Sequence, residues 1–173
     1  MDPSGWTPLH SAAFEGHHNV CNLIMDTVVD KNPKDATGLT PLHAAAQEGH
    51  REVCKLIIDS ILDKNPKSED GTTPLHFAAQ VGHKDVCKLI IDSVMDKNPK
   101  DADGWTPLHF AANNGHIDVF KLIMDVCMDI NPKNAKGRTP IYYAAKHGHN
   151  NISRLIMDAC KEENLKSAKR KGF

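Results

Sequence analysis

A sequence repeat with a constant step of 33 residues constrains this chain more than any other feature. Thr-Pro-Leu-His occurs at 7–10, 40–43, 73–76 and 106–109, and Thr-Pro-Ile-Tyr follows at 139–142. Gly49-His50 and its copies keep the same register, and five units cover nearly all 173 residues. Self-similarity at such a period is typical of solenoids, in which similar modules stack in single file.

Each unit predicts two short helices that follow a hairpin. Thr-Pro at 40–41 suits the N-cap and first helical position, where a missing amide hydrogen costs nothing, and Gly49 ends this helix. The second helix carries an apolar stripe at Val53, Leu56 (or Ile57) and Ile61. Asp-Lys-Asn-Pro at 63–66 breaks it, and Asp-Ala-Asp-Gly at 101–104 has hairpin-turn residues. Because one unit cannot bury both helices alone, we predict an all-α repeat solenoid of helix-turn-helix units joined by hairpin loops.

The chain resembles the ankyrin repeat family over about residues 2–169. The resemblance is carried by Gly38-x-Thr40-Pro41-Leu42-His43-x-Ala45-Ala46 and Gly49-His50-x-x-Val53, with their copies at steps of 33. It implies hairpin–helix–helix units, a curved solenoid and a protein-binding role without catalysis. It also implies that the repeated histidines are structural and hydrogen-bond to loop backbone.

One departure from the family pattern is systematic. Family members usually place Gly-Ala-Asp after the second helix, whereas here the first two of those positions are apolar: Val28-Val29, Ile61-Leu62, Val94-Met95 and Cys127-Met128. Without the helix-ending glycine, we expect the second helix to run about a turn longer, to roughly Asp63. We interpret the Ile/Val and Leu/Met exchanges between units as conservative changes in the core.

We expect one domain at 1–169, with repeats at 5–37, 38–70, 71–103, 104–136 and 137–169, followed by a basic tail at 170–173. The last repeat is interpreted as a C-terminal cap, because Lys161 replaces an apolar residue of the other units. The first repeat keeps the internal pattern at Val20 and Leu23, so we expect apolar surface there. Our hypothesis is that the repeats were cut from a longer array.

Variation between repeats indicates where a partner binds. The second and third repeats share 24 of 33 positions, and most differences fall at the hairpin or on exposed helix positions. In the ankyrin geometry the variable columns line the concave side. The predicted partner-binding residues are Trp6, Phe14, Leu39, Thr72, Phe77, Val81, Trp105, Phe110, Asn113, Asn114, Arg138, Tyr143, Lys146 and His147.

The aromatic residues in these columns have two interpretations. Trp6 and Trp105 are expected to be exposed anchors, since tryptophan is favoured in interface hot spots. Phe77, Phe110 and Tyr143 are either anchors as well or packing residues between neighbouring first helices.

Composition and motifs argue against other classes of function. The formal net charge of −1 argues against binding nucleic acid by bulk charge, and no apolar stretch has the length of a membrane span. The eleven histidines lack metal-site spacing, and no GxSxG, HExxH, GxGxxG or P-loop sequence occurs. We therefore expect no enzyme activity, no metal and no cofactor. A polar start and five cysteines without a CxxC pair favour an intracellular protein, cytoplasmic or nuclear.

The leading prediction is a monomeric, non-catalytic module that binds a protein or peptide partner through its concave face and hairpin tips. Two alternatives remain: a regulatory or substrate-recruiting arm of a larger multidomain protein or enzyme, and an engineered or consensus-like scaffold without an evolved partner. A further hypothesis concerns the column that asparaginyl hydroxylases modify in similar ankyrin proteins, which here holds Asn32, Asn65, Asn98 and Asn131.

Overall fold

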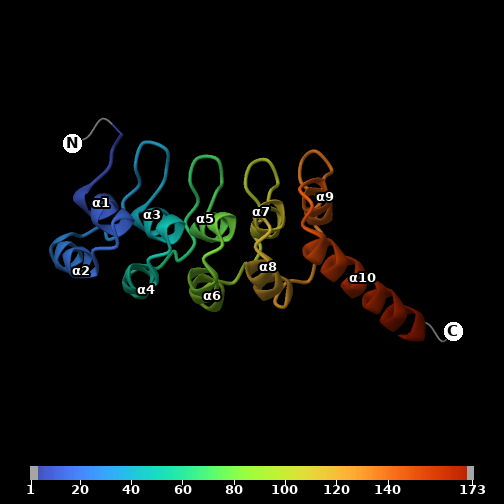
Figure 1. Cartoon of the computed structure of the whole chain (residues 1–173). Helices are drawn as coiled ribbons and strands as arrows, with labels where there is room; N and C mark the ends of the chain where they lie inside the picture. The colour runs from blue at the N-terminus through green and yellow to red at the C-terminus, as the bar shows by residue number, and fades with distance from the viewer. Residues whose placement is uncertain (1–3, 171–173) are drawn as a thin grey trace.

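The computed structural model describes the backbone of residues 4–170 and the side chains of residues 4–162. Within this range, helices follow one another in pairs, and each pair stacks beside the next (Figure 1). The first helices of the pairs are α1 (Pro8–Phe14), α3 (Pro41–Glu48), α5 (Pro74–Val81), α7 (Pro107–Asn114) and α9 (Pro140–Lys146). The second helices are α2 (His18–Thr27), α4 (Arg51–Ser60), α6 (Lys84–Ser93), α8 (Ile117–Met124) and α10 (Asn150–Arg170). No strand occurs within the described residues, so the predicted all-α repeat solenoid is confirmed.

Helices α3, α5 and α7 begin and end where the sequence predicts, whereas α1 and α9 end one residue earlier. Thr40 has extended backbone, with φ −122° and ψ 165°, and Pro41 is the first helical residue of α3. Gly49 ends α3 with a left-handed φ of 80°, a conformation that favours glycine.

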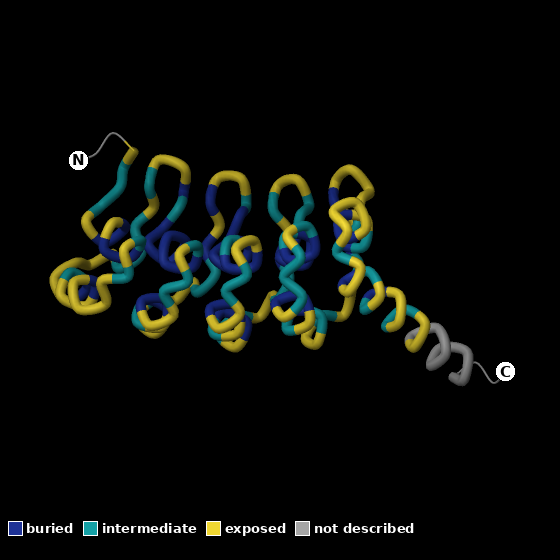
Figure 2. The backbone as a smooth tube through the Cα atoms, viewed as in Figure 1, coloured by how far each residue is buried: buried dark blue, intermediate teal, exposed yellow. Residues whose placement is uncertain are grey.

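Alanine determines how the pairs stack. Ala45 and Ala46 of α3 and Ala78 and Ala79 of α5 are fully buried between neighbouring first helices. Their small side chains let these helices approach closely, whereas the second helices bury larger residues such as Ile57 of α4. The buried residues form one band that crosses all five units (Figure 2).

The hairpins form a hydrogen-bonded row along one edge of the stack (Figure 1). Within the fourth hairpin, the Asp101 amide donates to the Trp105 carbonyl at 2.9 Å. Between hairpins, the Ala102 amide donates to the Asp70 carbonyl at 2.8 Å, and the other neighbouring pairs repeat this bond. Each hairpin is therefore held by the one before it.

The prediction that the second helix extends to Asp63 is wrong. Helix α4 ends at Ser60, because Ile61 is extended, with φ −123° and ψ 158°. The Ser60 hydroxyl donates to the Leu56 carbonyl at 2.9 Å and so satisfies a carbonyl of the last turn. The Asp63 carboxylate then accepts from the Asn65 amide at 3.2 Å, which closes a local turn. The chain thus leaves the helix at Ile61 without a glycine.

The last pair differs from the others in the length of its second helix. Helix α10 has 21 residues, whereas α4 and α6 have 10 each. Leu165 stands where the earlier units have proline, so the chain can continue as a helix. Arg170, the first residue of the predicted basic tail, ends α10, and residues 171–173 of that tail lie outside the described residues.

At the other end of the row, Val20 and Leu23 of α2 are exposed, as expected for an internal-type repeat without a neighbour on that side. Within residues 4–170, no helix has both the length and the apolar character that a membrane span requires.

Candidate functional site

Histidines on the first helices fix the hairpin positions that the sequence singles out. The Thr40 amide donates to Nδ1 of His43 at 3.1 Å, so the ring proton is on Nε2, which donates to the Thr72 carbonyl at 3.1 Å. The corresponding histidines of α1, α5 and α7 reach the carbonyls of Leu39, Trp105 and Arg138 at 3.1–3.2 Å. Each carbonyl belongs to a predicted partner-binding residue.

A second set of histidines holds the ends of the first helices. Nε2 of His50 donates to the Phe14 carbonyl at 2.8 Å, and Nε2 of His149 donates to the Asn113 carbonyl at 3.0 Å. His83 and His116 make the same contact with the carbonyls of Gln47 and Gln80. Two of the predicted columns therefore have backbone held by a histidine of a neighbouring repeat, as the family resemblance implies.

Burial keeps the first set of histidines neutral. It lowers the pKa of His43 and of His76 to about 4, and it also lowers the pKa of His10 and His109. Protonation would place a hydrogen on Nδ1, which already accepts a backbone amide. These rings are committed to the fold and are not free to act as general bases or metal ligands.

One aromatic cluster lies at the N-terminal end of the row of first helices. Trp6 stacks on His10 with ring centroids 5.6 Å apart and meets the edge of Phe14 at 5.9 Å. Nε1 of Trp6 donates to Oδ2 of Asp35 at 3.1 Å. Although burial opposes ionisation, this bond and others from Thr37 and Leu39 lower the pKa of the Asp35 carboxyl. Trp6 is half-buried and fixed rather than a freely exposed anchor.

A second aromatic cluster lies nearer the C-terminal end. The ring centroid of Trp105 lies 4.4 Å from that of Tyr143 and 5.0 Å from that of Phe110. The Arg138 guanidinium lies over the Tyr142 ring, 5.1 Å from its centroid. Trp105 is half-buried, so one part of its ring packs on neighbours while another part remains accessible.

The predicted partner-binding residues differ in how much surface they expose. Tyr143 is 5% exposed and Thr72 is 9% exposed, so both mainly pack within the stack. The half-buried members are Trp6, Phe14, Leu39, Phe77, Trp105, Phe110 and Asn113. The exposed members are Val81, Asn114, Arg138, Lys146 and His147. We call the surface that these twelve residues share the first-helix face, since all lie on first helices or immediately beside them.

Sequence reasoning missed a second apolar feature, beyond the ends of the second helices. Val29, Leu62, Met95 and Met128, here called the outer ladder, are 98–101% exposed. The prediction that the Leu62/Met95 exchange lies in the core is wrong. The extended residues just before them, Ile61 and Val94, still pack against the core, as predicted for the Ile/Val exchange, and Leu62 and Met95 face solvent. Lys161 occupies the same column in the last repeat. This charged residue was the one signal in the sequence that the column faces solvent.

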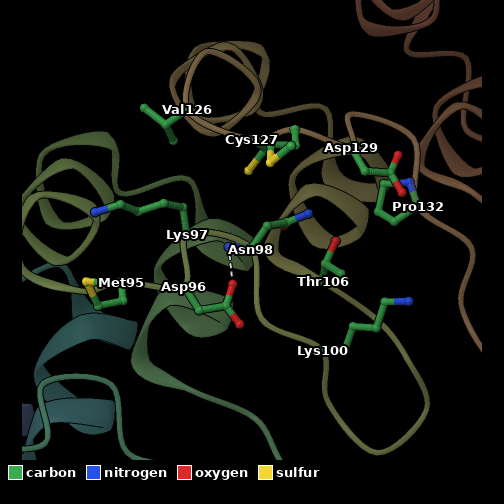
Figure 3. Close-up of a pocket in the computed structure, with 11 residues that line it drawn as sticks. Met95, Asp96, Lys97, Asn98, Lys100, Thr106, Val126, Cys127, Asp129 and Pro132 are labelled. Atoms are coloured by element: carbon green, nitrogen blue, oxygen red, sulfur yellow. Dashed lines mark hydrogen bonds between the residues drawn. The ribbon is translucent and has the colours of Figure 1, made fainter.

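Shallow depressions lie between successive members of the outer ladder. One has a volume of about 390 Å³ and is lined by Met95, Cys127 and Met128 together with charged side chains (Figure 3). Its charged lining has two carboxylates and two ammonium groups, from Asp96, Asp129, Lys97 and Lys100. This depression therefore has no dominant charge.

Two buried cysteines are poor nucleophiles. Burial raises the pKa of Cys54 and Cys87 to about 12, so both thiols stay protonated and unreactive at neutral pH. In the part of the chain that the structure describes, no three His, Cys, Asp or Glu residues gather to hold a metal ion.

Comparison with protein-family models identifies the family of this chain. The family model for ankyrin repeats (three copies) matches residues 1–68, 27–101, 60–134 and 93–168. The chain belongs to the ankyrin repeat family. Ankyrin repeats are generally protein-interaction modules, typically without enzyme activity. A search of the curated proteins found no match.

Proposed function

We propose that this ankyrin domain is a non-catalytic recognition module whose first-helix face binds a protein or peptide partner. We take residues 1–169 as the domain and expect it to act as a monomer inside the cell. The observation that carries the proposal is the pair of aromatic clusters around Trp6 and Trp105, in which histidines hold the backbone of Phe14 and of Trp105. Such surfaces lose little conformational entropy when they bind.

Several features support this face over the rest of the molecule. Its aromatic rings are partly accessible, and tryptophan contributes strongly to interface hot spots. The exposed polar residues around them, such as Asn114, Arg138 and Lys146, supply a rim that can select between partners. Hydrogen bonds between neighbouring hairpins keep these groups in register.

The proposal is tested by affinity capture from lysate with the wild-type chain and variants as baits. Trp105→Ala removes the central ring, and Val81→Glu adds a charge at a 46% exposed position on the same face. We expect both variants to bind the captured partner at least tenfold more weakly, because each alters the contact area. Isothermal titration calorimetry with the purified partner measures the change.

Met95→Ala in the outer ladder is the matched control, and we expect it to keep the wild-type affinity. Circular dichroism melts separate lost binding from lost folding, and Val81→Glu keeps the test valid if Trp105→Ala unfolds. Wild-type affinity in a folded Val81→Glu variant, or a wild-type bait that captures nothing specific, would contradict the proposal.

A further inference from the structure

The first-helix face has opposite charge at its two ends. Exposed carboxylates lie on the first three units and their hairpins: Glu15, Glu48, Glu69, Asp70 and Asp103. The fifth hairpin and α9 expose only Lys136, Arg138 and Lys146 as charged residues, with no carboxylate among residues 134–147. Lys34, Lys67 and Lys100 are exposed beside the same hairpins, but the five carboxylates outnumber them. The face is therefore net acidic over its first part and basic at its last repeat.

These charges are not neutralised within the fold. The ion pairs within the described residues all join side chains of second helices: Arg51–Glu52, Lys55–Asp59, Lys88–Asp92 and Lys161–Asp158. None involves a carboxylate or cation of the first-helix face. A binding partner is consequently the available source of opposite charge for both ends.

The acidic end contains a cleft of suitable shape for a cationic side chain. A depression of about 270 Å³ lies between the second and third hairpins, where Leu39 and Phe77 supply apolar walls and Glu69 and Asp70 supply carboxylates. Lysine and arginine combine a long aliphatic stem with a charged end, so both parts find a complementary surface here.

Hydrogen bonds keep the Asp70 carboxylate ionised and fixed. The Ser68 hydroxyl donates to Oδ1 of Asp70 at 2.5 Å, and the Thr72 amide donates to the same oxygen at 3.1 Å. The Ser68 bond is the main reason that the pKa of Asp70 is lowered. The backbone of Glu69 is held as well, because its amide donates to the Thr37 carbonyl at 3.0 Å.

We propose that the partner is a segment of mixed charge that binds in one direction, an inference that rests on the proposed function. A lysine or arginine of the segment enters the Leu39–Phe77–Glu69–Asp70 cleft, and a carboxylate meets Arg138 and Lys146 at the fifth repeat. Packed helices lie about 8–10 Å apart, so the two contacts are separated by roughly 25 Å, or about eight extended residues.

The test is a displayed library of random 16-residue peptides, selected against the wild-type chain. We expect selected peptides to contain a lysine or arginine separated from an aspartate or glutamate by about six to ten residues. Against Glu69→Lys, their affinity is expected to fall at least fivefold, and the loss should shrink in 0.5 M salt. Asp85→Lys on α6 is the charge-matched control, with an expected change below twofold.

The outcomes separate this inference from the function on which it rests. Peptides that lose affinity with Val81→Glu but not with Glu69→Lys overturn the charge inference and leave the recognition face standing. Peptides that bind both variants as tightly as they bind the wild-type chain contradict both statements. A selection that enriches no sequence does so as well. Selected peptides without the paired opposite charges also overturn the inference.

Discussion

Apolar side chains reach the surface of this molecule in two regions, and the two are built differently. On the first-helix face, Trp105 packs on Tyr143 and Phe110, and its carbonyl accepts a hydrogen bond from His76. In the outer ladder, Val29, Leu62 and Met95 each follow an extended residue, and all four members are almost completely exposed. Exposure alone therefore does not identify a recognition surface, because only the first region has its groups fixed in advance.

The largest expected effect comes from acid, which acts on the buried histidines that hold the first-helix face and leaves the outer ladder unaffected. His43 and His76 have folded pKa values near 4, below the ordinary 6.5, so the unfolded chain binds more protons between these values. Stability is then complete above pH 6.5 and falls as the pH drops toward 4, by up to roughly 3 kcal/mol for each ring. Urea denaturation at several pH values measures this loss.

His76→Gln sharpens the acid experiment, because glutamine keeps a polar side chain at the same helix position without titrating there. The variant should lose less stability than wild type between pH 6.5 and 4. Asp35 and Asp70, whose pKa values are lowered, add a separate loss at more acidic pH. Equal pH dependence in both chains would show that the buried rings are not responsible.

A pair of apolar truncations compares the core with the outer ladder directly. Ile57→Ala leaves a cavity at a fully buried position and should lower the free energy of unfolding by about 2–5 kcal/mol. Leu62→Ala, five residues later, removes a fully exposed side chain and should change it by less than about 0.5 kcal/mol. Comparable losses in urea denaturation would show that the ladder is packed in solution.

Two glycines test the histidine contact between repeats. A Cβ on Gly82 would lie 2.5 Å from Nδ1 of His116, whereas a Cβ on Gly148 would meet nothing within 4 Å. Both glycines have a left-handed φ, so alanine at either site costs roughly 1–2 kcal/mol from the backbone alone. Gly82→Ala should cost about 1 kcal/mol more than Gly148→Ala, since it also displaces the ring. Equal melting temperatures would contradict this contact.

The sequence predicts the fold well where local chemistry repeats. Thr-Pro and Gly49 mark the ends of the first helices because N-capping, fixed φ and the left-handed conformation are properties of single residues. The end of the second helix could not be predicted in the same way. The backbone becomes extended at Ile61 and the Asp63 carboxylate closes the next turn, although the apolar pattern continues through Leu62.

The sequence singles out the columns of the candidate site, whose binding role stays a prediction, but it does not indicate their contacts. Trp6 and Asp35 are 29 positions apart, and no local pattern indicates that the indole donates to this carboxylate. The burial of Tyr143 likewise depends on Trp105 of the preceding repeat and on Asn134, whose amide donates to the phenol oxygen at 3.1 Å. Such contacts arise only when neighbouring units stack.

Hydroxyl-radical footprinting of the complex with the captured partner tests the central claim most directly. Tryptophan and phenylalanine report on the first-helix face, and methionine, which oxidises readily, reports on the outer ladder. We predict that the partner protects Trp105 and Phe110 from oxidation and leaves Met95 and Met128 as reactive as in the free chain. Protection of the two methionines with Trp105 unchanged would contradict the account and assign recognition to the outer ladder.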